Sequence, residues 1–170
     1  PMETINGLQV TSYGLPEALD WVASQSRWAE RKGKLPRGRG LGLGCSHFVS
    51  GAAKPVQWTG QPDATVTMRL DFDGNVTVFT GATEIGQGSS TVVAQVATEV
   101  LGLDHSRVRV VANDSALIPK DNGSYSSRVT YMVGNAALAA AEKLKQTLLA
   151  AAARKLECDA AQVECHGEEY

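Results

Sequence analysis

A chain of 170 residues with a formal charge of −2 is long enough for one ordinary domain with its own core. Nucleic-acid binding normally needs a clear basic excess, so we expect no nucleic acid among its partners. No apolar run approaches the roughly 20 residues that cross a bilayer, so we expect no membrane partner. Three scattered cysteines favour buried free thiols and a reducing cytoplasm over a disulfide framework.

The first 60 residues are expected to form a separate N-terminal part that begins with a helix. Pro16 suits the first turn of a helix, and apolar residues continue at helical spacing from Ala18 to Ala29. We expect this helix to end at Gly33.

A basic segment and a glycine-rich segment complete this N-terminal part. Six Lys and Arg residues lie between positions 27 and 39, which we interpret as a solvated linker; a patch for an acidic partner is the alternative. Residues 41–51 are rich in glycine and predict a strand. His47 lies within it and has no second histidine at ligand spacing, which favours a structural role.

Residues 61–170 form the second predicted domain, which opens with a β hairpin. Apolar and polar side chains alternate from Ala64 to Asp71, and Asp73-Gly74 supplies turn chemistry before Val76. This pattern predicts a hairpin with one buried face.

The hairpin leads into a glycine-rich turn at residues 80–91, followed by a helix-like run. Glycines allow close approach of a ligand, and Ser89 or Ser90 is expected to cap the helix, leaving its first N–H groups to face an anion. A P-loop does not fit, because Gln87 stands where the lysine belongs, and Thr91 replaces the third glycine of a dinucleotide fingerprint. The turn is interpreted as an anion site with Gln87 as its polar reader; an ordinary glycine-rich turn is the alternative.

A second polar loop, residues 119–128, precedes a long helix with an apolar face from Val133 to Ala151. Hydroxyl groups and an arginine before a helix N-terminus predict a second anion site. A capping-rich loop without a ligand is the simpler alternative. Because the two loops bracket one helix and one strand, we expect them to share one anionic ligand.

A weak repeat relates residues 101–110 to residues 156–165: each is a helix end, a short polar turn and a strand start. Together with the hairpin, this repeat predicts an α+β fold, in which a two-layer mixed sheet is covered by helices. The chain begins with Pro1-Met2 and stops at Tyr170 within a strand-like pattern, so we expect it to be a piece of a longer polypeptide.

Three segments, residues 81–89, 96–102 and 121–128, resemble the molybdopterin-binding region of the large subunit in the xanthine dehydrogenase family, the molybdenum hydroxylases. Within that family, the sequence most resembles the large subunits of the 4-hydroxybenzoyl-CoA reductases. The resemblance implies a molybdenum cofactor-binding domain in residues 61–170 and a parent oxidoreductase that reduces 4-hydroxybenzoyl-CoA to benzoyl-CoA in aromatic degradation. A same-family hydroxylase of aldehydes, purines or other aromatics is the first alternative. A non-catalytic nucleotide- or partner-binding module is the second.

The resemblance also implies a cofactor, molybdenum held on a molybdopterin cytosine dinucleotide. In the parent enzyme it implies partners as well: the remainder of the large subunit, and domains or subunits with iron–sulfur clusters and FAD. No catalytic residue or direct metal ligand is expected in this chain, because the family's glutamate base lies on a later part of the subunit; the piece alone is expected to be inactive. The residues that the resemblance implies for cofactor binding are Gly86, Gln87, Gly88, Ser89, Ser90, Thr91, Ser124, Tyr125, Ser126, Ser127 and Arg128.

Overall fold

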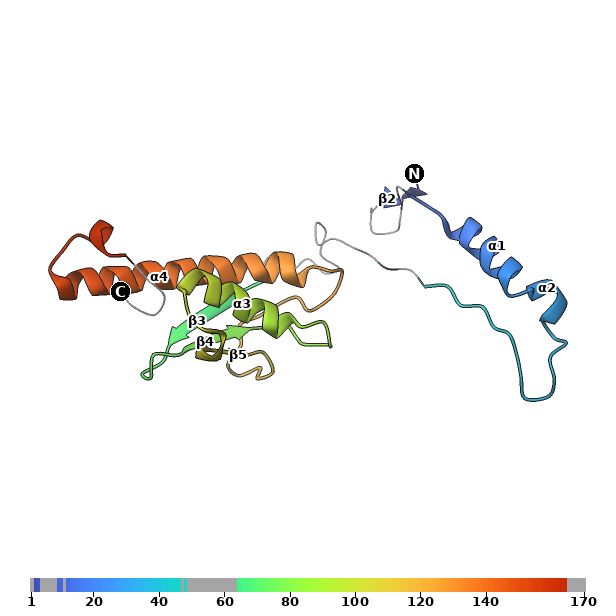
Figure 1. Cartoon of the computed structure of the whole chain (residues 1–170), viewed down its shortest axis with the longest axis horizontal. Helices are drawn as coiled ribbons and strands as arrows, with labels where there is room; N and C mark the ends of the chain where they lie inside the picture. The colour runs from blue at the N-terminus through green and yellow to red at the C-terminus, as the bar shows by residue number, and fades with distance from the viewer. Residues whose placement is uncertain (1, 4–8, 11, 47, 49–63, 165–170) are drawn as a thin grey trace. The chain divides into compact units, whose positions relative to one another are not determined.

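A computed structural model describes residues 2–3, 9–10, 12–46, 48 and 64–164 of the chain. The chain divides into two compact units, drawn in Figure 1. These are Pro1–His47 and Phe48–Tyr170. The boundary predicted at residue 60 lies outside the described residues. None of the described helices is long and apolar enough to cross a membrane.

The N-terminal unit pairs two short strands, β1 (Met2–Glu3) and β2 (Gln9–Val10), and continues into two helices, α1 (Leu15–Gln25) and α2 (Trp28–Arg31). Pro16 lies in the first turn of α1, as predicted. The single helix expected to reach Gly33 is wrong. Arg27 adopts a left-handed conformation, with φ of 52°, which breaks the helix between α1 and α2.

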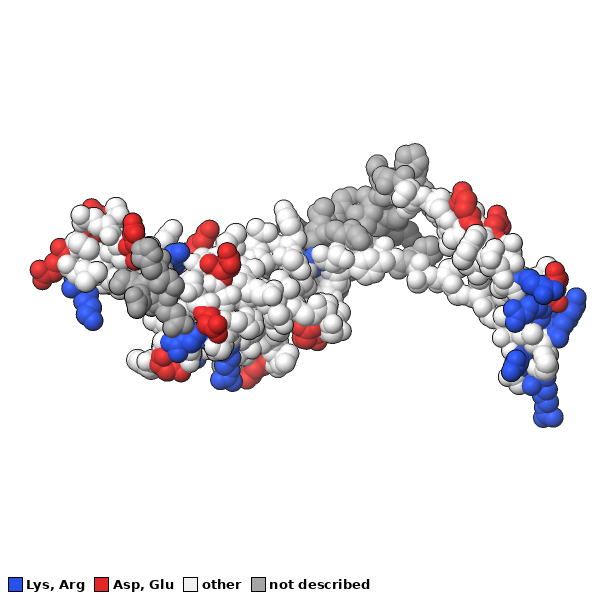
Figure 2. Space-filling model, in the orientation of Figure 1, with Lys and Arg blue, Asp and Glu red and all other residues white. Residues whose placement is uncertain are grey.

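The Lys and Arg residues of the basic segment are all exposed, and Figure 2 shows Lys and Arg side chains gathered on the surface of this unit. Arg27 pairs with Glu30, and the Lys32 ammonium lies 4.8 Å from the centre of the Trp28 ring. The strand predicted over residues 41–51 is wrong for residues 41–46, which have no regular secondary structure. His47 and residues 49–51 lie outside the described part of the chain.

The second unit is built on a three-stranded mixed sheet of order β3-β4-β5. Strands β3 (Val66–Leu70) and β4 (Val76–Thr80) form the predicted antiparallel hairpin. Strand β5 (Val108–Val111) pairs parallel to β4, with Val76 opposite Val108. A parallel neighbour requires a crossover, and the helix after the glycine-rich turn provides it.

Two helices cover this sheet, α3 (Ser89–Leu101) and α4 (Gly134–Leu156). They pack against each other, while α3 also contacts β5 and α4 contacts β3. A π-helical turn, Val129–Val133, leads directly into α4. The predicted α+β architecture, a mixed sheet covered by helices, is therefore confirmed, and both helices begin at the end of the sheet where β4 stops (Figure 1).

The core lies between the sheet and the two helices. Strand β4 contributes two hydrophobic residues that are at most 1% exposed, and α3 and α4 contribute the facing residues at helical spacing. The fully buried hydrophobic residues are Val76, Val78, Ala82, Val93, Ala97, Leu101, Val133, Ala137 and Ala141.

The weak repeat corresponds to the same turn structure at both helix ends. Gly102 and Glu157 end α3 and α4 in left-handed conformations. An aspartate then caps each of two 3-10 helices, His105–Arg107 and Ala160–Gln162, by accepting from a backbone N–H at 2.8 and 2.9 Å respectively. The strand predicted after the second turn extends beyond the described residues.

The prediction of buried thiols is wrong for two of the three cysteines. Cys45 and Cys158 are both exposed and free. Cys158 lies two residues after the end of α4, where the chain has left the core, and Cys45 lies in the irregular segment of the N-terminal unit.

Gly81→Ala should destabilise the second unit by about 1–3 kcal/mol, because overpacking forces backbone shifts. A Cβ at position 81 would lie 2.5 Å from Cβ of Asp121 and 2.7 Å from the carbonyl oxygen of Pro119. Urea unfolding measures the loss. Gly134→Ala is the matched control, since its Cβ meets no heavy atom of the described residues within 4 Å and alanine favours a helix by about 1 kcal/mol. Equal effects of the two changes would contradict the steric explanation.

Candidate functional site

The first loop, residues 81–88, connects the end of β4 to the start of α3. At the start of the loop, the Ala82 N–H donates to Thr80 Oγ1 at 3.2 Å. It ends at Gly88, the N-cap residue of α3, whose φ of 79° is a conformation that favours glycine. The expected cap by Ser89 or Ser90 is wrong: helix α3 starts at Ser89, and the acceptor for its N-terminal groups comes from further back in the loop.

That acceptor is the carboxylate of Glu84. Its Oε1 accepts from the N–H groups of Gly86 and Gly88, each at 2.9 Å. Its Oε2 accepts from the Ser90 N–H and the Ser89 hydroxyl, each at 3.3 Å. The turn therefore does hold an anion at the helix N-terminus, but that anion belongs to the chain itself.

These donors lower the pKa of the Glu84 carboxyl, and the N–H of Gly88 has the largest effect. The charged form is the one that the turn stabilises. The turn is thus shaped around a carboxylate, although the loop is exposed to solvent.

Gln87 folds its carboxamide back over the same loop. Its Nε2 donates to the carbonyl oxygen of Thr83 at 3.0 Å, and its Oε1 accepts from the Ile85 N–H at 2.6 Å. Both ends of the carboxamide are therefore oriented, which fixes the side chain without burying it.

The second loop, residues 119–128, is organised by a buried ion pair. Arg128 Nη1 lies 2.7 Å from Asp121 Oδ1, and both side chains are 1% exposed. The same nitrogen donates to the carbonyl oxygen of Gly123 at 2.7 Å, and the Gly123 N–H donates to Asp121 Oδ1 at 2.8 Å. The guanidinium also lies 5.7 Å from the centre of the Tyr125 ring. Asp121 Oδ2 is buried and has no hydrogen-bond partner among the described residues.

The backbone of this loop is strained next to the ion pair. Ser126 and Ser127 have φ of 54° and 55°, which is rarely adopted by residues other than glycine. The π-helical turn Val129–Val133 follows directly. Left-handed non-glycine residues and π-turns both occur preferentially at functional sites, so this combination favours a binding role for the loop.

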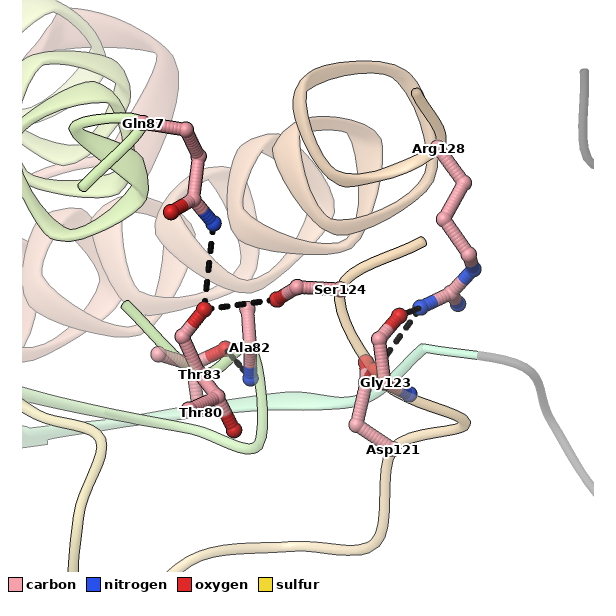
Figure 3. A network of polar contacts seen from close by, with 8 residues as sticks. All are labelled: Thr80, Ala82, Thr83, Gln87, Asp121, Gly123, Ser124 and Arg128. Carbon is pink, nitrogen blue, oxygen red and sulfur yellow. Dashed lines mark hydrogen bonds and ion pairs between the residues drawn. The ribbon is translucent and has the colours of Figure 1, made fainter. Parts of the chain in front are cut away.

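The two loops meet at the carbonyl oxygen of Thr83, as Figure 3 shows. Ser124 Oγ donates to this oxygen at 2.6 Å, and Gln87 Nε2 donates to the same oxygen at 3.0 Å. Gly81 and Asp121 also touch, because the absent Cβ of the glycine leaves room for the aspartate. Two segments some 40 residues apart in sequence are thus held in one place.

A cavity of about 370 Å³ opens between the loops, within the size range of small-molecule sites. It is lined by both loops and by the π-turn. Its lining residues are Phe48, Ile85, Gln87, Ser124, Tyr125, Ser126, Ser127, Arg128, Val129 and Thr130.

The structure therefore brings six of the predicted cofactor residues to one cavity: Gln87 from the first loop and the five residues 124–128 from the second. Gly86, Gly88, Ser89, Ser90 and Thr91 are not among the lining residues of this cavity. Gly86 and Gly88 shape the turn through their positive φ, and Ser89 is 3% exposed. Their predicted contacts to the cofactor remain predictions.

Three residues with structural roles in the site were not predicted from the sequence: Thr83, Glu84 and Asp121. Thr83 acts through its backbone carbonyl, which no sequence pattern marks. Glu84 and Asp121 are acidic residues in loops predicted to bind anions, and this apparent conflict of charge was the available signal. Among the described residues, no cluster of three or more His, Cys, Asp or Glu side chains could hold a metal ion.

The profile of the molybdopterin cofactor-binding domain matches residues 15–170. The chain belongs to the molybdopterin cofactor-binding domain family. The predicted resemblance to the molybdopterin-binding region of the xanthine dehydrogenase family is confirmed at this level.

Relatives of this molybdopterin-binding domain are parts of larger proteins. It is 34% identical over 155 residues to the xanthine dehydrogenase molybdenum-binding subunit of Escherichia coli O157:H7. The aligned region covers 88% of this chain and 20% of that protein. It is also 34% identical over 149 residues to the nicotine 6-hydroxylase large subunit of Paenarthrobacter nicotinovorans, covering 84% and 18%. The chain thus spans about a fifth of the length of these relatives.

Solved structures give the same family likeness. Quinoline 2-oxidoreductase from Pseudomonas putida 86 matches with a TM-score of 0.55 and 30% identity, over 61% of this chain and 13% of that one. CO dehydrogenase from Oligotropha carboxidovorans matches with a TM-score of 0.57 and 28% identity, over 60% and 13%.

Arg128→Met should destabilise the second unit by about 3–5 kcal/mol, because it leaves the buried Asp121 carboxylate without its cation. Arg69→Met is the control, since Arg69 pairs with Asp71 at 2.7 Å but its side chain is 62% exposed. The loss of such a surface pair costs at most about 1 kcal/mol. Urea unfolding of both variants tests this difference, and a similar loss in each would contradict it.

Glu84→Gln should alter how stability depends on pH. The folded-state pKa of Glu84 lies below its ordinary value, so the carboxylate stabilises the fold above that ordinary value and loses this effect as pH falls through the folded pKa. Wild type should therefore exceed Glu84→Gln in stability near about pH 7, and the difference should shrink toward about pH 3. Urea midpoints across this range measure it. A difference that does not change with pH would show that the charge of Glu84 plays no part.

Proposed function

We propose that the cavity between the two loops holds the molybdenum cofactor in the large subunit of a molybdenum-dependent oxidoreductase. The observation that supports this most directly is that Gln87 and residues 124–128, assigned to the cofactor from the sequence alone, line one cavity. The match to the molybdopterin cofactor-binding family gives the cavity its ligand class.

The residues of the cavity fit such a group. Gln87 has a carboxamide that can both donate and accept, and it makes one hydrogen bond of each kind within the loop, so its second N–H and second lone pair could bind polar atoms of a pterin. Ser124, Ser126 and Ser127 offer hydroxyl groups and a backbone bent to an unusual conformation. Tyr125 adds an aromatic face. The cofactor would supply the redox chemistry, and the chain would supply orientation and hydrogen bonds.

The proposal extends to the form of the cofactor and to the partners of the chain. We assign a molybdopterin cytosine dinucleotide, with iron–sulfur clusters and FAD on other domains or subunits of a cytoplasmic parent enzyme. The relatives named as subunits support an assembly of several chains. Because this chain spans about a fifth of their length, we propose that it builds one wall of the cofactor site and is inactive alone.

The proposed substrate of the parent enzyme is 4-hydroxybenzoyl-CoA, which it would reduce to benzoyl-CoA. This assignment rests on the sequence resemblance. The relatives carry the names of a xanthine dehydrogenase and a nicotine 6-hydroxylase, so hydroxylation of a heterocycle is the competing reaction. Assaying the parent enzyme with 4-hydroxybenzoyl-CoA, xanthine and nicotine distinguishes them: turnover of a heterocycle without turnover of the thioester would reject the substrate proposal.

Gln87→Ala in the parent enzyme should lower the molybdenum content after purification or the turnover rate, since the carboxamide that faces the cavity is lost. Metal analysis and steady-state kinetics measure the two effects. Gln95→Ala is the matched control, because Gln95 is the same residue type on α3 and is absent from the lining of this cavity. It should retain both properties.

Two results would reject the cofactor assignment. One is unchanged molybdenum content and kinetics in Gln87→Ala. The other is a chain that binds adenine nucleotides with magnesium in preference to cytidine nucleotides, which would favour a nucleotide-binding module instead.

A further inference from the structure

Glu84 occupies the position where the sequence suggested an external anion. Four donors converge on its carboxylate: the N–H groups of Gly86, Gly88 and Ser90, and the hydroxyl of Ser89. Two oxygens with about four lone-pair directions match four donors, so these bonds use the full acceptor capacity of the carboxylate.

We propose that Glu84 is the resident anion of the α3 N-terminus and the positioning residue of the first loop, which leaves Gln87 rather than the helix N–H groups to meet the cofactor. This inference deepens the proposed function, on which its relevance to the cofactor rests. Its first part, the filled anion site, concerns this chain alone.

The hydrogen bonds of Glu84 support its role in positioning the first loop. Glu84 fixes the backbone on both sides of Gln87, through the N–H groups of Gly86 and Gly88 at 2.9 Å. Gln87 in turn donates to the Thr83 carbonyl, which also accepts from Ser124 of the second loop. Movement of the carboxylate would therefore release the turn, the carboxamide and one of the bonds between the loops.

The negative charge of Glu84 disfavours a second anion at the N-terminus of α3. The N-terminus of a helix behaves as about half a positive charge, and a full carboxylate already lies on it. A phosphate at the same N–H groups would meet occupied donors and a like charge. We therefore assign the phosphate groups of the cofactor to donors other than the Ser89 hydroxyl and the Ser90 N–H, which revises the expectation from the sequence for these two residues.

A phosphate titration of the 170-residue chain, followed by amide NMR, tests this inference with inorganic phosphate as the probe. In wild type, the Gly86, Gly88 and Ser90 amide signals should not respond to phosphate. In Glu84→Ala, the donors that the carboxylate leaves free should bind phosphate at least about tenfold more tightly than wild type does. The chemical-shift changes should be confined to these three amides. Glu99→Ala, which removes an exposed glutamate on the same helix, should behave as wild type.

Phosphate-dependent shifts of these three amides in wild type would overturn the inference, as would a folded Glu84→Ala chain that ignores phosphate. Should Glu84→Ala fail to fold, Glu84→Gln replaces it and is expected to bind phosphate between the two extremes; no binding would again overturn the inference. Glu84→Asp keeps the charge and should restore the wild-type response. Because the probe is phosphate, these results do not depend on whether the cavity takes a molybdenum cofactor.

Discussion

The buried ion pair between Asp121 and Arg128 is the constraint on which the site depends. Both side chains are 1% exposed, so neither charge is solvated and each needs the other. The pair closes the second loop on Gly123, and Asp121 packs where Gly81 has no side chain. One charged contact thus fixes the shape of the second loop and also its place against the first.

An internal carboxylate organises each loop, Glu84 in the first and Asp121 in the second. Each accepts from backbone N–H groups that an outside ligand would otherwise use. The loops therefore keep their shape through bonds within the chain, and the side chains that face the cavity, such as Gln87 and Ser124, are preorganised. The cavity is therefore lined by hydrogen-bonding side chains such as Gln87 and Ser124, and the N–H groups that Glu84 occupies at the start of α3 are not free to meet a ligand there.

The hairpin, the helix after the glycine-rich turn and the two polar loops were predictable because their signals are local: alternation, helical spacing, and turn residues. The helix break at Arg27 was not, since a left-handed arginine has no sequence signature. Glu84 shows the same limit at the site. The sequence indicated an anion at the α3 N-terminus, but only coordinates identify which carboxylate fills it, because the partners of a side chain depend on the path of the loop.

The topology explains why these loops meet. Strand β4 ends where the first loop begins, and α3 and α4 both start at that end of the sheet (Figure 1). Ligands of sheets with crossover helices commonly bind beyond the carboxyl end of a strand, where such loops converge. Here the Glu84 carboxylate offsets the partial positive charge at the N-terminus of α3. A π-helical turn precedes α4, and its residues Val129 and Thr130 line the cavity. The fold therefore supplies the location, and the two loops supply the chemistry.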